Sequence, residues 1–266
     1  MTGTSSATGL LAGKVVVLSG VGPGLGRALG KQLAGAGADL VLAARTERRL
    51  EKAAAVVGEL GRRALVVPTD ITDEAACRNL LEAAMAEFGQ VDCLVNNAFA
   101  IPPMEPLTTL ELDTIRASHE TNVLAPLRLI TLFAPALAER RGSVVMINSA
   151  VIHHSQVEFG GYKLAKAALL HMASSLATEL GPRGIRVNSV APGWIYENVQ
   201  KAYFDYLAGE RGVSSQEVYD DIASATDLKR LPLPEEVADT VIFLASDMAS
   251  AITGQCIDVN CGEYHN

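Results

Sequence analysis

Several features are scarce or missing in this sequence, and each absence excludes a class of protein. Only four of the 266 residues are cysteines, and no two of them form a C-x-x-C pair. We therefore expect reduced thiols rather than disulfides, and no metal site. The chain does not open on a basic segment followed by an apolar run, and no uninterrupted apolar stretch reaches the roughly 18–20 residues of a membrane span. A cytoplasmic protein without a membrane partner is expected.

The chain also has fewer positively charged than negatively charged residues. Lysine and arginine total 22 against 30 aspartates and glutamates, which gives a net charge of −8 and a pI near 5.2. An acidic surface repels nucleic acids and anionic membranes, so no nucleic-acid partner is expected. Apolar residues make up 49% of the chain, which is enough for a sizeable core.

The sequence contains no internal repeat, low-complexity run or linker. A length of 266 residues fits one large α/β domain or two small ones. Without a linker, one domain is the better interpretation. It covers residues 11–266, after a flexible terminus at 1–10.

Short β-branched apolar runs alternate with helical stretches along the whole chain. Strands are expected at 14–19, 39–44, 63–68, 91–95, 143–148, 185–191 and 256–259. Helices are expected at 27–36, 46–60, 74–88, 113–137, 162–180 and 234–246. This alternation predicts the α/β class: a single-domain Rossmann-type, doubly wound parallel sheet, flanked by helices on both faces and joined by right-handed crossovers.

Chemically distinctive residues follow the ends of the expected strands. They are the glycine turn at 20–26, Arg45, Asp70, Asn97, Ser149 and the pair Pro192-Gly193. In an open parallel sheet, ligands bind at the carboxyl ends of the strands. Because these independent features fall on that one edge, a ligand site is predicted there.

The glycine turn has the spacing G-x-x-x-G-x-G, through Gly20, Gly24 and Gly26. It does not have the spacing G-x-G-x-x-G, since Leu25 stands at the last position. Glycine permits positive φ angles and lets a diphosphate approach the backbone above a helix amino end. Between a strand and a helix, such a turn favours nucleotide binding over an ordinary glycine-rich connection.

Tyr162 and Lys166 stand four residues apart in a stretch rich in helix formers, and Ser149 lies thirteen residues before Tyr162. On a helix the two side chains share one face. A phenol with a pKa of about 10 needs roughly 4 kcal/mol of preference for its phenolate to reach about 7, and an ammonium about 4 Å away supplies that much. Lys166 is thus expected to lower the pKa of Tyr162. The alternative, which the pair alone favours, is an exposed tyrosine and lysine on a helix surface.

Taken together, these motifs resemble the classical short-chain dehydrogenase/reductase family over residues 11–262. The run S-G-x-x-x-G-L-G at 19–26 stands where that family carries T-G-x-x-x-G-I-G, and N-N-A at 96–98 matches three letters of N-N-A-G. Asn122, Ser149, Tyr162 and Lys166 match its catalytic set. The P-G at 192–193, P-E-E-V at 234–237 and I-T-G-Q at 252–255 match the later part of its pattern.

The resemblance implies an oxidoreductase that transfers a hydride between a nicotinamide cofactor and a carbonyl or secondary alcohol. Tyr162 would be the acid or base toward the substrate oxygen, and Ser149 would donate a hydrogen bond to that oxygen. Lys166 would lower the pKa of Tyr162 and hold the nicotinamide ribose, while Asn122 would place a water that connects Lys166 to solvent. Cofactor contacts are implied for Gly20, Gly22, Gly24, Leu25, Gly26, Arg45, Asp70, Ile71, Asn97, Ala98, Tyr162, Lys166, Pro192, Gly193 and Ile195.

The choice of cofactor depends on the end of the second strand. An acid there would bind the ribose hydroxyls of NAD and repel the 2′-phosphate of NADP. Here Ala44 takes that position and Arg45 follows, and an arginine pairs bidentately with a phosphate. NADP(H) is therefore favoured, with NAD(H) as the alternative.

Three residues depart from the family pattern. Phe99 replaces the glycine of N-N-A-G and puts a ring near the expected nicotinamide pocket. Glu197 stands where the family often has a threonine that touches the cofactor, and Cys261 replaces the first glycine of a G-G pair. The first two either change the contour of the expected site or are neutral drift on a loop.

Substrate identity is the least constrained property. The segment 194–233, which we call the lid segment, stands where the family places its substrate lid, and it carries a large share of the aromatic residues. With Phe99, Phe159 and Trp194 as lining residues, the expected substrate is apolar: a ring ketone, a steroid-like alcohol or a 3-oxoacyl group. The alternative is that these rings pack the lid segment or a subunit contact.

Two further expectations concern the whole molecule. The helix at 164–180 is apolar almost all round, and one domain buries one face of a helix, so a homotetramer is expected. The alternative to an enzyme is a catalytically silent nucleotide-binding regulatory or scaffold protein. The intact Asn122, Ser149, Tyr162 and Lys166 disfavour that alternative.

Overall fold

Seven parallel strands form one sheet in the order β3-β2-β1-β4-β5-β6-β7. The computed structural model that defines it describes residues 9–265, without the side chains of residues 198 and 199, so the flexible terminus expected at 1–10 lies almost entirely outside the described residues. The strands are β1 (Val15–Ser19), β2 (Asp39–Ala44), β3 (Ala64–Pro68), β4 (Cys93–Asn96), β5 (Ser143–Ile147), β6 (Arg186–Pro192) and β7 (Cys256–Val259). The predicted fold class is confirmed. The strand order reverses between β1 and β4, which makes the carboxyl edge there the natural ligand position.

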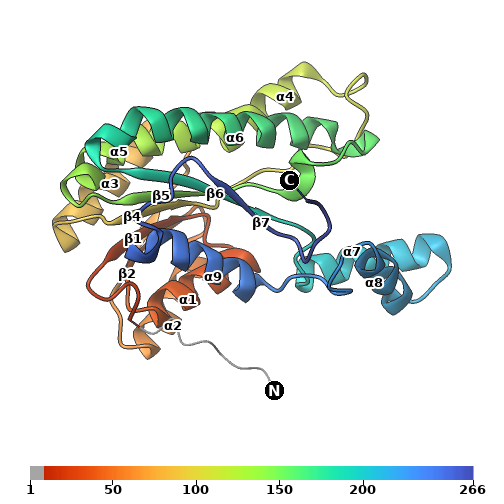
Figure 1. Cartoon of the computed structure of the whole chain (residues 1–266), viewed down its shortest axis with the longest axis horizontal. Helices are drawn as coiled ribbons and strands as arrows, with labels where there is room; N and C mark the ends of the chain where they lie inside the picture. The colour runs from red at the N-terminus through yellow and green to blue at the C-terminus, as the bar shows by residue number, and fades with distance from the viewer. Residues whose placement is uncertain (1–8, 266) are drawn as a thin grey trace.

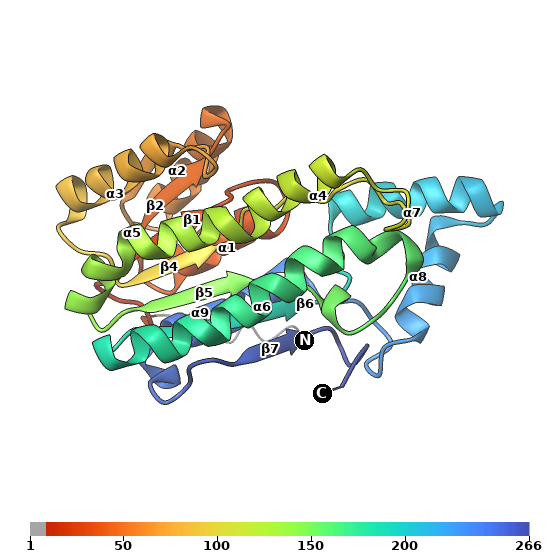
Figure 2. The ribbon, with the colours of Figure 1, turned by 90° about the horizontal axis from the view of Figure 1, so that it is seen from above.

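Helices cover both faces of this sheet (Figures 1 and 2). One face carries α1 (Leu25–Gly35), α2 (Glu47–Glu59) and α9 (Pro234–Ala245); the other carries α3 (Glu74–Phe88), α5 (Ala125–Glu139) and α6 (Gly160–Leu180), with α4 (Leu112–His119) leading into α5. In β1, Val15 and Val17 belong to one core, and Val16 and Leu18 belong to the other. Because successive strand side chains point to opposite faces, a sheet covered on both sides requires such continuous apolar runs.

The helix expected near 113–137 is divided in two. A π-helical turn, Glu120–Leu124, separates α4 from α5. Pro126 has no N–H to donate to the carbonyl of Asn122, four residues earlier, so the regular helical ladder is broken there. By length and hydropathy alone Leu112–Glu139 could cross a membrane, but 56% of its apolar window is buried inside the fold, as in the core helix of a globular protein.

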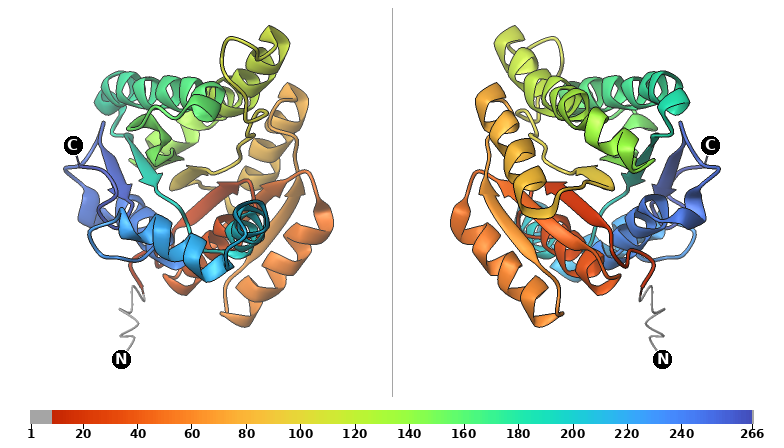
Figure 3. Two further views of the ribbon diagram at one scale, coloured as in Figure 1. Left: turned by 90° about the vertical axis from the view of Figure 1, so that its right-hand side faces the viewer. Right: turned by 90° about the vertical axis from the view of Figure 1, so that its left-hand side faces the viewer.

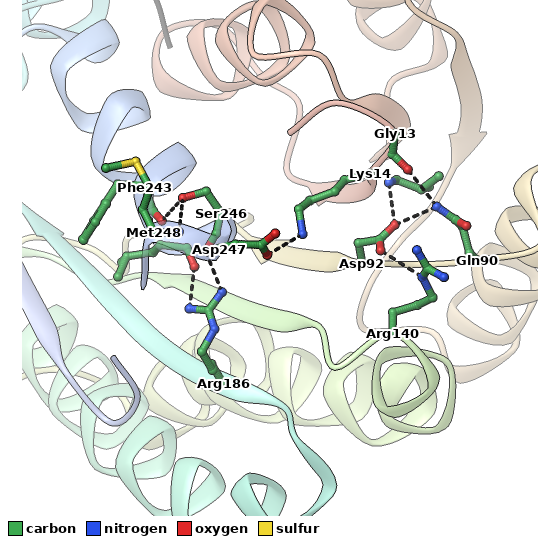
Figure 4. Close-up of polar contacts among 12 residues, drawn as sticks. Gly13, Lys14, Gln90, Asp92, Arg140, Arg186, Phe243, Ser246, Asp247 and Met248 are labelled. Carbon is green, nitrogen blue, oxygen red and sulfur yellow. Dashed lines mark hydrogen bonds and ion pairs between the residues drawn. The ribbon is translucent and has the colours of Figure 1, made fainter. Parts of the chain in front are cut away.

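The amino ends of the strands are held by paired charged side chains (Figure 4). Asp92 accepts hydrogen bonds from the Val15 backbone N–H at 2.8 Å, from Gln90 Nε2 at 2.9 Å and from Arg140 Nε at 3.0 Å. Arg186 donates to two backbone carbonyls at the end of α9, at 2.8 and 3.1 Å. Buried charges are tolerated when they are hydrogen-bonded in this way, so this edge is built for stability.

The lid segment follows the carboxyl end of β6 and projects from one end of the molecule (Figures 1 and 3). It contains α7 (Asn198–Arg211) and α8 (Ser215–Ser224), and its ends are tied by a hydrogen bond of 2.8 Å from the Tyr196 N–H to the Pro232 carbonyl. A small core of its own surrounds Phe204, which is 1% exposed. The rings of Tyr196, Phe204 and Tyr219 lie 4.7 to 6.5 Å apart, so these aromatics pack the lid segment itself.

Candidate active site

The glycine turn between β1 and α1 is so tightly packed that larger residues are excluded at two positions. A Cβ at Gly20 would lie 2.3 Å from the Ala98 backbone nitrogen, and a Cβ at Gly26 would lie 2.4 Å from the Gly20 carbonyl oxygen. Gly20 and Gly24 also have positive φ angles, 85° and 74°. Asn97 Nδ2 donates to the Gly20 carbonyl at 2.7 Å and so ties the end of β4 to the turn. Helix α1 has neither a side-chain cap nor an acidic residue in its first turn, which suits an anionic ligand at its amino end.

Other predicted cofactor residues lie around this turn. Gly22 has no close neighbour at its missing Cβ, the nearest atom being the Gly20 carbonyl oxygen at 4.0 Å. Leu25 and Ile195 are partly buried against the core on the α1 side of the sheet. Leu25 and Ile195 therefore shape the surroundings of the glycine turn by packing.

The ends of β2 and β3 carry one exposed cation and one anion. Arg45 is exposed directly after β2, while Asp70 follows β3 and accepts from the Thr72 hydroxyl at 2.7 Å and from the Thr72 N–H at 3.0 Å. These hydrogen bonds, aided by the charge of Arg45, lower the pKa of Asp70, so its carboxylate is ionised at neutral pH. Ile71 is 7% exposed, and its carbonyl accepts from Arg128 Nη1 at 3.0 Å.

Asn122 lies in the π-helical turn and is 1% exposed. Its Nδ2 donates to the carbonyls of Ala100 and Ser118 at 2.8 and 2.9 Å, and its Oδ1 accepts from the Ala100 N–H at 3.2 Å. The side chain therefore fastens the loop that follows β4. The group of Asn122 that suits a water is its backbone carbonyl, which Pro126 leaves without an α-helical donor.

Ser149, Tyr162 and Lys166 meet at the carboxyl end of β5. The Ser149 hydroxyl accepts from the Val151 N–H at 3.3 Å and shares a hydrogen bond with the Tyr162 hydroxyl. Lys166 is 3% exposed, its Nζ donates to the Ile147 carbonyl at 2.8 Å, and the same atom lies 5.6 Å from the centre of the Tyr162 ring. The exposed-surface alternative is therefore wrong for Lys166.

The electrostatics of these three residues differ from the expectation. Burial raises the pKa of Tyr162 above its usual range, and the hydrogen bond with Ser149 opposes this only in part. Burial also lowers the pKa of Lys166 to about 7. The predicted net lowering of the Tyr162 pKa is wrong for this structure: burial outweighs the lowering influences, and the Lys166 ammonium is directed to a backbone carbonyl. Tyr162 is therefore a protonated hydroxyl at neutral pH.

The turn after β6 is packed against the C-terminal tail. Gly193 N–H donates to the Val259 carbonyl at 3.1 Å, and a Cβ at Gly193 would lie 2.9 Å from a Glu263 carboxylate oxygen and 3.0 Å from Asn260 Cβ. Cys261 adopts a φ of 55°, a left-handed angle that favours glycine. The chain thus keeps the backbone turn expected of a G-G pair with one larger residue in it, and Pro192, the last residue of β6, leads directly into this packed region.

A series of aromatic rings, which we call the aromatic wall, connects the start of α6 with the segment after β6. Ring centres lie 5.5 Å apart for His154 and Phe159, 6.3 Å for Phe159 and Trp194, and 6.0 Å for the stacked pair of Trp194 and Tyr203. Tyr264 joins through His154 at 5.7 Å. Tyr264 was not predicted to line the site. His154 is five residues after Ser149, which is a usable signal, but Tyr264 joins the wall only because the tail folds back.

Phe99 lies beside the predicted catalytic set rather than in the aromatic wall. It is 53% exposed, and its ring centre is 5.8 Å from Lys166 Nζ. A glycine at this position would leave that side of Lys166 uncovered. Phe99 therefore narrows the site on the β4 side.

Glu197, which stands where the family often has a threonine that touches the cofactor, bends over the glycine turn. A Cβ built on Gly24 would lie 1.9 and 2.3 Å from its two carboxylate oxygens. Burial raises the pKa of Glu197, and the charge of Arg27 on α1 opposes that shift.

Comparison with known proteins identifies the family. A family model described as enoyl-(acyl carrier protein) reductase matches residues 20–264. A short chain dehydrogenase/reductase of Aspergillus oryzae is 32% identical over 255 residues, covering 95% of each chain. The 3-oxoacyl-(acyl carrier protein) reductase FabG of Salmonella typhimurium is 34% identical over 254 residues, covering 95% of this chain and 98% of the relative.

Solved structures agree with these relatives. L-sorbose reductase from Gluconobacter frateurii, complexed with NADPH and L-sorbose, superposes with a TM-score of 0.90 at 29% identity and covers 96% of this chain and 98% of that one. A 7 alpha-hydroxysteroid dehydrogenase, complexed with NADH and 7-oxo glycochenodeoxycholic acid, gives a TM-score of 0.85 at 28% identity and covers 98% of both chains. The chain therefore belongs to the classical short-chain dehydrogenase/reductase family.

Proposed function

We propose that this protein is an oxidoreductase that reduces the carbonyl group of an apolar substrate with NADPH and oxidises the matching alcohol in reverse. The observation that carries the proposal is the hydrogen-bonded pair of Ser149 and Tyr162 beside the buried Lys166. These residues lie on the same sheet edge as the glycine turn. Full-length relatives named as dehydrogenases and reductases favour an enzyme over a silent nucleotide-binding scaffold.

The residues at this edge fit a nicotinamide dinucleotide. The glycine turn is a cradle that a Cβ at Gly20 or Gly26 would fill, and it stands above the amino end of α1. At one end of the site Asp70 offers an ionised acceptor, and at the other end lies Lys166. When bound, the cofactor supplies or accepts the hydride.

The side chains divide the proton chemistry between them. Tyr162, held protonated by burial, donates its proton to the substrate oxygen, while the Ser149 hydroxyl stabilises the charge that develops on that oxygen. The phenolate that remains favours the charged form of Lys166. Because the pKa of Lys166 is about 7, this side chain takes up a proton from solvent at neutral pH and passes it to the Tyr162 phenolate. The Asn122 carbonyl offers an acceptor for a water on that route.

The preference for NADPH rests on Arg45. It is exposed at the end of β2, and its charge reaches Asp70 at the adenine end of the site. Among the structural neighbours, L-sorbose reductase carries NADPH and the hydroxysteroid dehydrogenase carries NADH, so the family accommodates either cofactor. A guanidinium beside a 2′-phosphate contributes about 1.5–3 kcal/mol, or a tenfold to hundredfold change in affinity.

Titration of the wild type and of Arg45→Ala with NADPH and NADH tests this preference. The substitution should weaken NADPH binding by ten- to a hundredfold and leave NADH binding nearly unchanged. Arg116→Ala, which removes an exposed arginine on α4, is the matched control and should change neither affinity. A wild type that already prefers NADH, or an equal loss of both affinities in Arg45→Ala, would refute the role of Arg45.

The proposed substrate class rests on the aromatic wall and on Phe99. The rings of Phe159, at the start of α6, and Trp194, after β6, lie 6.3 Å apart, and Phe99 holds a half-exposed ring beside Lys166. Apolar contact areas of this kind favour ring ketones, steroid-like alcohols and acyl chains over polyols. The relatives act on diverse substrates, so the proposed substrate class is inferred from the aromatic wall and not from membership of the family.

A nicotinamide absorbance assay with a panel of carbonyl compounds tests the substrate class. Cyclic ketones, 3-oxosteroids and 3-oxoacyl thioesters should be reduced with lower KM than ketose sugars. Trp194→Ala should raise KM for the apolar compounds and leave KM for a small ketone such as acetone unchanged. If a ketose were the best substrate, the apolar assignment would be wrong.

A homotetramer is also part of the proposal. Leu112, Leu124 and Leu164 are 65%, 47% and 45% exposed on α4, the π-helical turn and α6, which pack as neighbours. In the later turns of α6 the exposed positions are the polar residues His171, Ser174, Ser175, Thr178 and Glu179. Light scattering at micromolar concentration checks the assembly, and Leu124→Asp with Leu164→Asp should reduce its mass. A monomeric wild type would rule it out.

A further inference from the structure

Glu197 places a carboxylate where a phosphate group would bind. Both of its oxygens and its carboxyl carbon lie within 2.3 Å of the point that a Cβ on Gly24 would occupy. The residue is the N-cap of α7, with φ and ψ of −142° and 178°, and its carbonyl accepts from the Lys201 N–H at 2.8 Å. The residue whose carboxylate lies over the glycine turn thus immediately precedes the first turn of α7.

The surroundings attract an anion to this place. Helix α1 begins at Leu25 with no acidic residue in its first turn and no side chain that caps it, so its first N–H groups and its dipole are uncompensated there. Arg27, on the same turn, adds a positive charge that favours the ionised form of Glu197. A diphosphate would use the same helix end. The Glu197 carboxylate and a diphosphate cannot both occupy this helix end at the same time.

We propose that Glu197 is an internal competitor for the diphosphate of the nicotinamide cofactor, which must displace its carboxylate from the glycine turn and thereby shift the start of α7. This inference rests on the proposed use of a nicotinamide cofactor. It assigns to Glu197 a role in setting cofactor affinity. It also links cofactor binding to the lid segment, because the displaced side chain belongs to the cap of its first helix.

A competitor of this kind lowers apparent affinity by the fraction of molecules in which it occupies the turn. The apparent dissociation constant is the intrinsic constant divided by the competent fraction. Glu197→Gln keeps the size of the side chain and removes its charge, while Glu197→Ala removes the side chain. Both should bind a diphosphate ligand about tenfold more tightly than the wild type if Glu197 occupies the turn about nine-tenths of the time.

Calorimetric titration with ADP-ribose and with adenosine isolates the diphosphate. ADP-ribose carries the diphosphate without a nicotinamide, so its binding does not depend on turnover, and adenosine carries no phosphate. The tightening should appear for ADP-ribose and NADPH and should be absent for adenosine. Glu210→Gln, an exposed acid on the same helix, is the matched control and should bind all of these ligands like the wild type.

Fluorescence supplies a second readout of the displacement. Trp194, three residues before Glu197, is the only tryptophan of the chain. Its emission should change when ADP-ribose binds to the wild type, and the change should be smaller in Glu197→Ala, where no carboxylate has to leave. An emission change of equal size in both proteins would contradict the link to α7.

The outcomes separate the inference from the proposed function. If the wild type binds NADPH and Glu197→Gln and Glu197→Ala bind it equally well or more weakly, the inference fails and the cofactor assignment stands. If the wild type fails to bind and Glu197→Ala binds, the inference is supported in its strongest form. If ADP-ribose, NADPH and NADH bind to none of the variants, both fail together.

Discussion

The two edges of the sheet use buried polar groups for opposite purposes. At the amino edge Asp92 is 5% exposed and receives three hydrogen bonds from three different parts of the chain. At the carboxyl edge Lys166 is 3% exposed, yet among the described residues its Nζ makes a single hydrogen bond, to the Ile147 carbonyl. An ammonium has three donors, so two of them remain for a ligand or water.

This difference separates the edge that stabilises the fold from the edge that keeps polar groups available to a ligand. Satisfied charges at the amino edge strengthen the sheet, whereas incompletely satisfied groups at the carboxyl edge weaken it and keep chemistry available. The shift in the pKa of Lys166 to about 7 is a measure of that weakening. If the comparison is right, substitutions at the two edges should separate activity from stability.

The largest effect is expected from Tyr162→Phe at the carboxyl edge. Removing the hydroxyl deletes the proton donor and little contact area, so turnover should fall by about 10³-fold while NADPH affinity stays within a few fold. The melting temperature should not fall, because Ser149 keeps its other hydrogen bond. Steady-state kinetics and a thermal melt measure both quantities.

Tyr206→Phe is the control for that experiment. Tyr206 is 62% exposed on α7, so its hydroxyl should be dispensable for turnover. Turnover of Tyr162→Phe above a few per cent of the wild type would show that the catalytic assignment is wrong.

The opposite result is expected from Asp92→Ala at the amino edge. It leaves the Val15 N–H and the Arg140 guanidinium without their acceptor, which should destabilise the protein by about 3 kcal/mol. The kcat and KM of the folded protein should not change. Urea unfolding measures the loss, and Asp113→Ala, which breaks an exposed pair with Arg116, should cost less than about 0.5 kcal/mol. A loss of kcat with stability intact would show that the amino edge takes part in catalysis.

Gly26→Ala tests the carboxyl edge at the start of α1. Its new Cβ would meet the Gly20 carbonyl oxygen at 2.4 Å, so the glycine turn must shift. We expect a loss of about 2 kcal/mol in stability and weaker NADPH binding. Gly30→Ala, one turn later in α1, has open space around its Cβ and should instead stabilise the helix by about 0.5–1 kcal/mol. Equal effects at the two positions would mean that the turn is not a specific cradle.

The sequence was sufficient for the sheet and for the edge of the sheet on which the predicted site residues lie. Continuous β-branched runs such as Val15–Ser19 predict buried parallel strands, and every expected strand is present within two residues of its predicted ends. The residues of the glycine turn and of the catalytic set were placed on the correct edge, because the carboxyl ends of parallel strands must meet there.

What the sequence could not supply depends on contacts between distant segments. One helix was expected to continue through Pro126, so neither the break at Glu120–Leu124 nor its π-helical form was predicted. The sign of the Tyr162 pKa shift was missed because spacing along a helix gives the distance to Lys166 and not the desolvation of both groups. The contact of Glu197 with Gly24 joins residues that only the arrangement of the lid segment brings together.

The smallest effect, and the most direct test of the comparison, is a pH-dependent gain in stability for Lys166→Met. The pKa of Lys166 is 10.5 in the unfolded chain and about 7 in the folded protein. Below pH 7 the lysine is charged in both states, so its burial costs the folded protein the full desolvation penalty. As the pH rises above 7, the folded state loses the proton while the unfolded state keeps it, and the stability of the wild type increases. Methionine has no such dependence.

Lys166→Met should therefore be more stable than the wild type at pH 7, and its advantage should shrink by about 1 kcal/mol between pH 7 and pH 8. Urea unfolding at both pH values gives the difference directly. Lys31→Met, an exposed substitution on α1, is the control for replacing a lysine by methionine. A stability difference for Lys166→Met that is independent of pH would mean that the buried lysine keeps its ordinary pKa. Burial of Lys166 at the carboxyl edge would then not lower the free energy of unfolding.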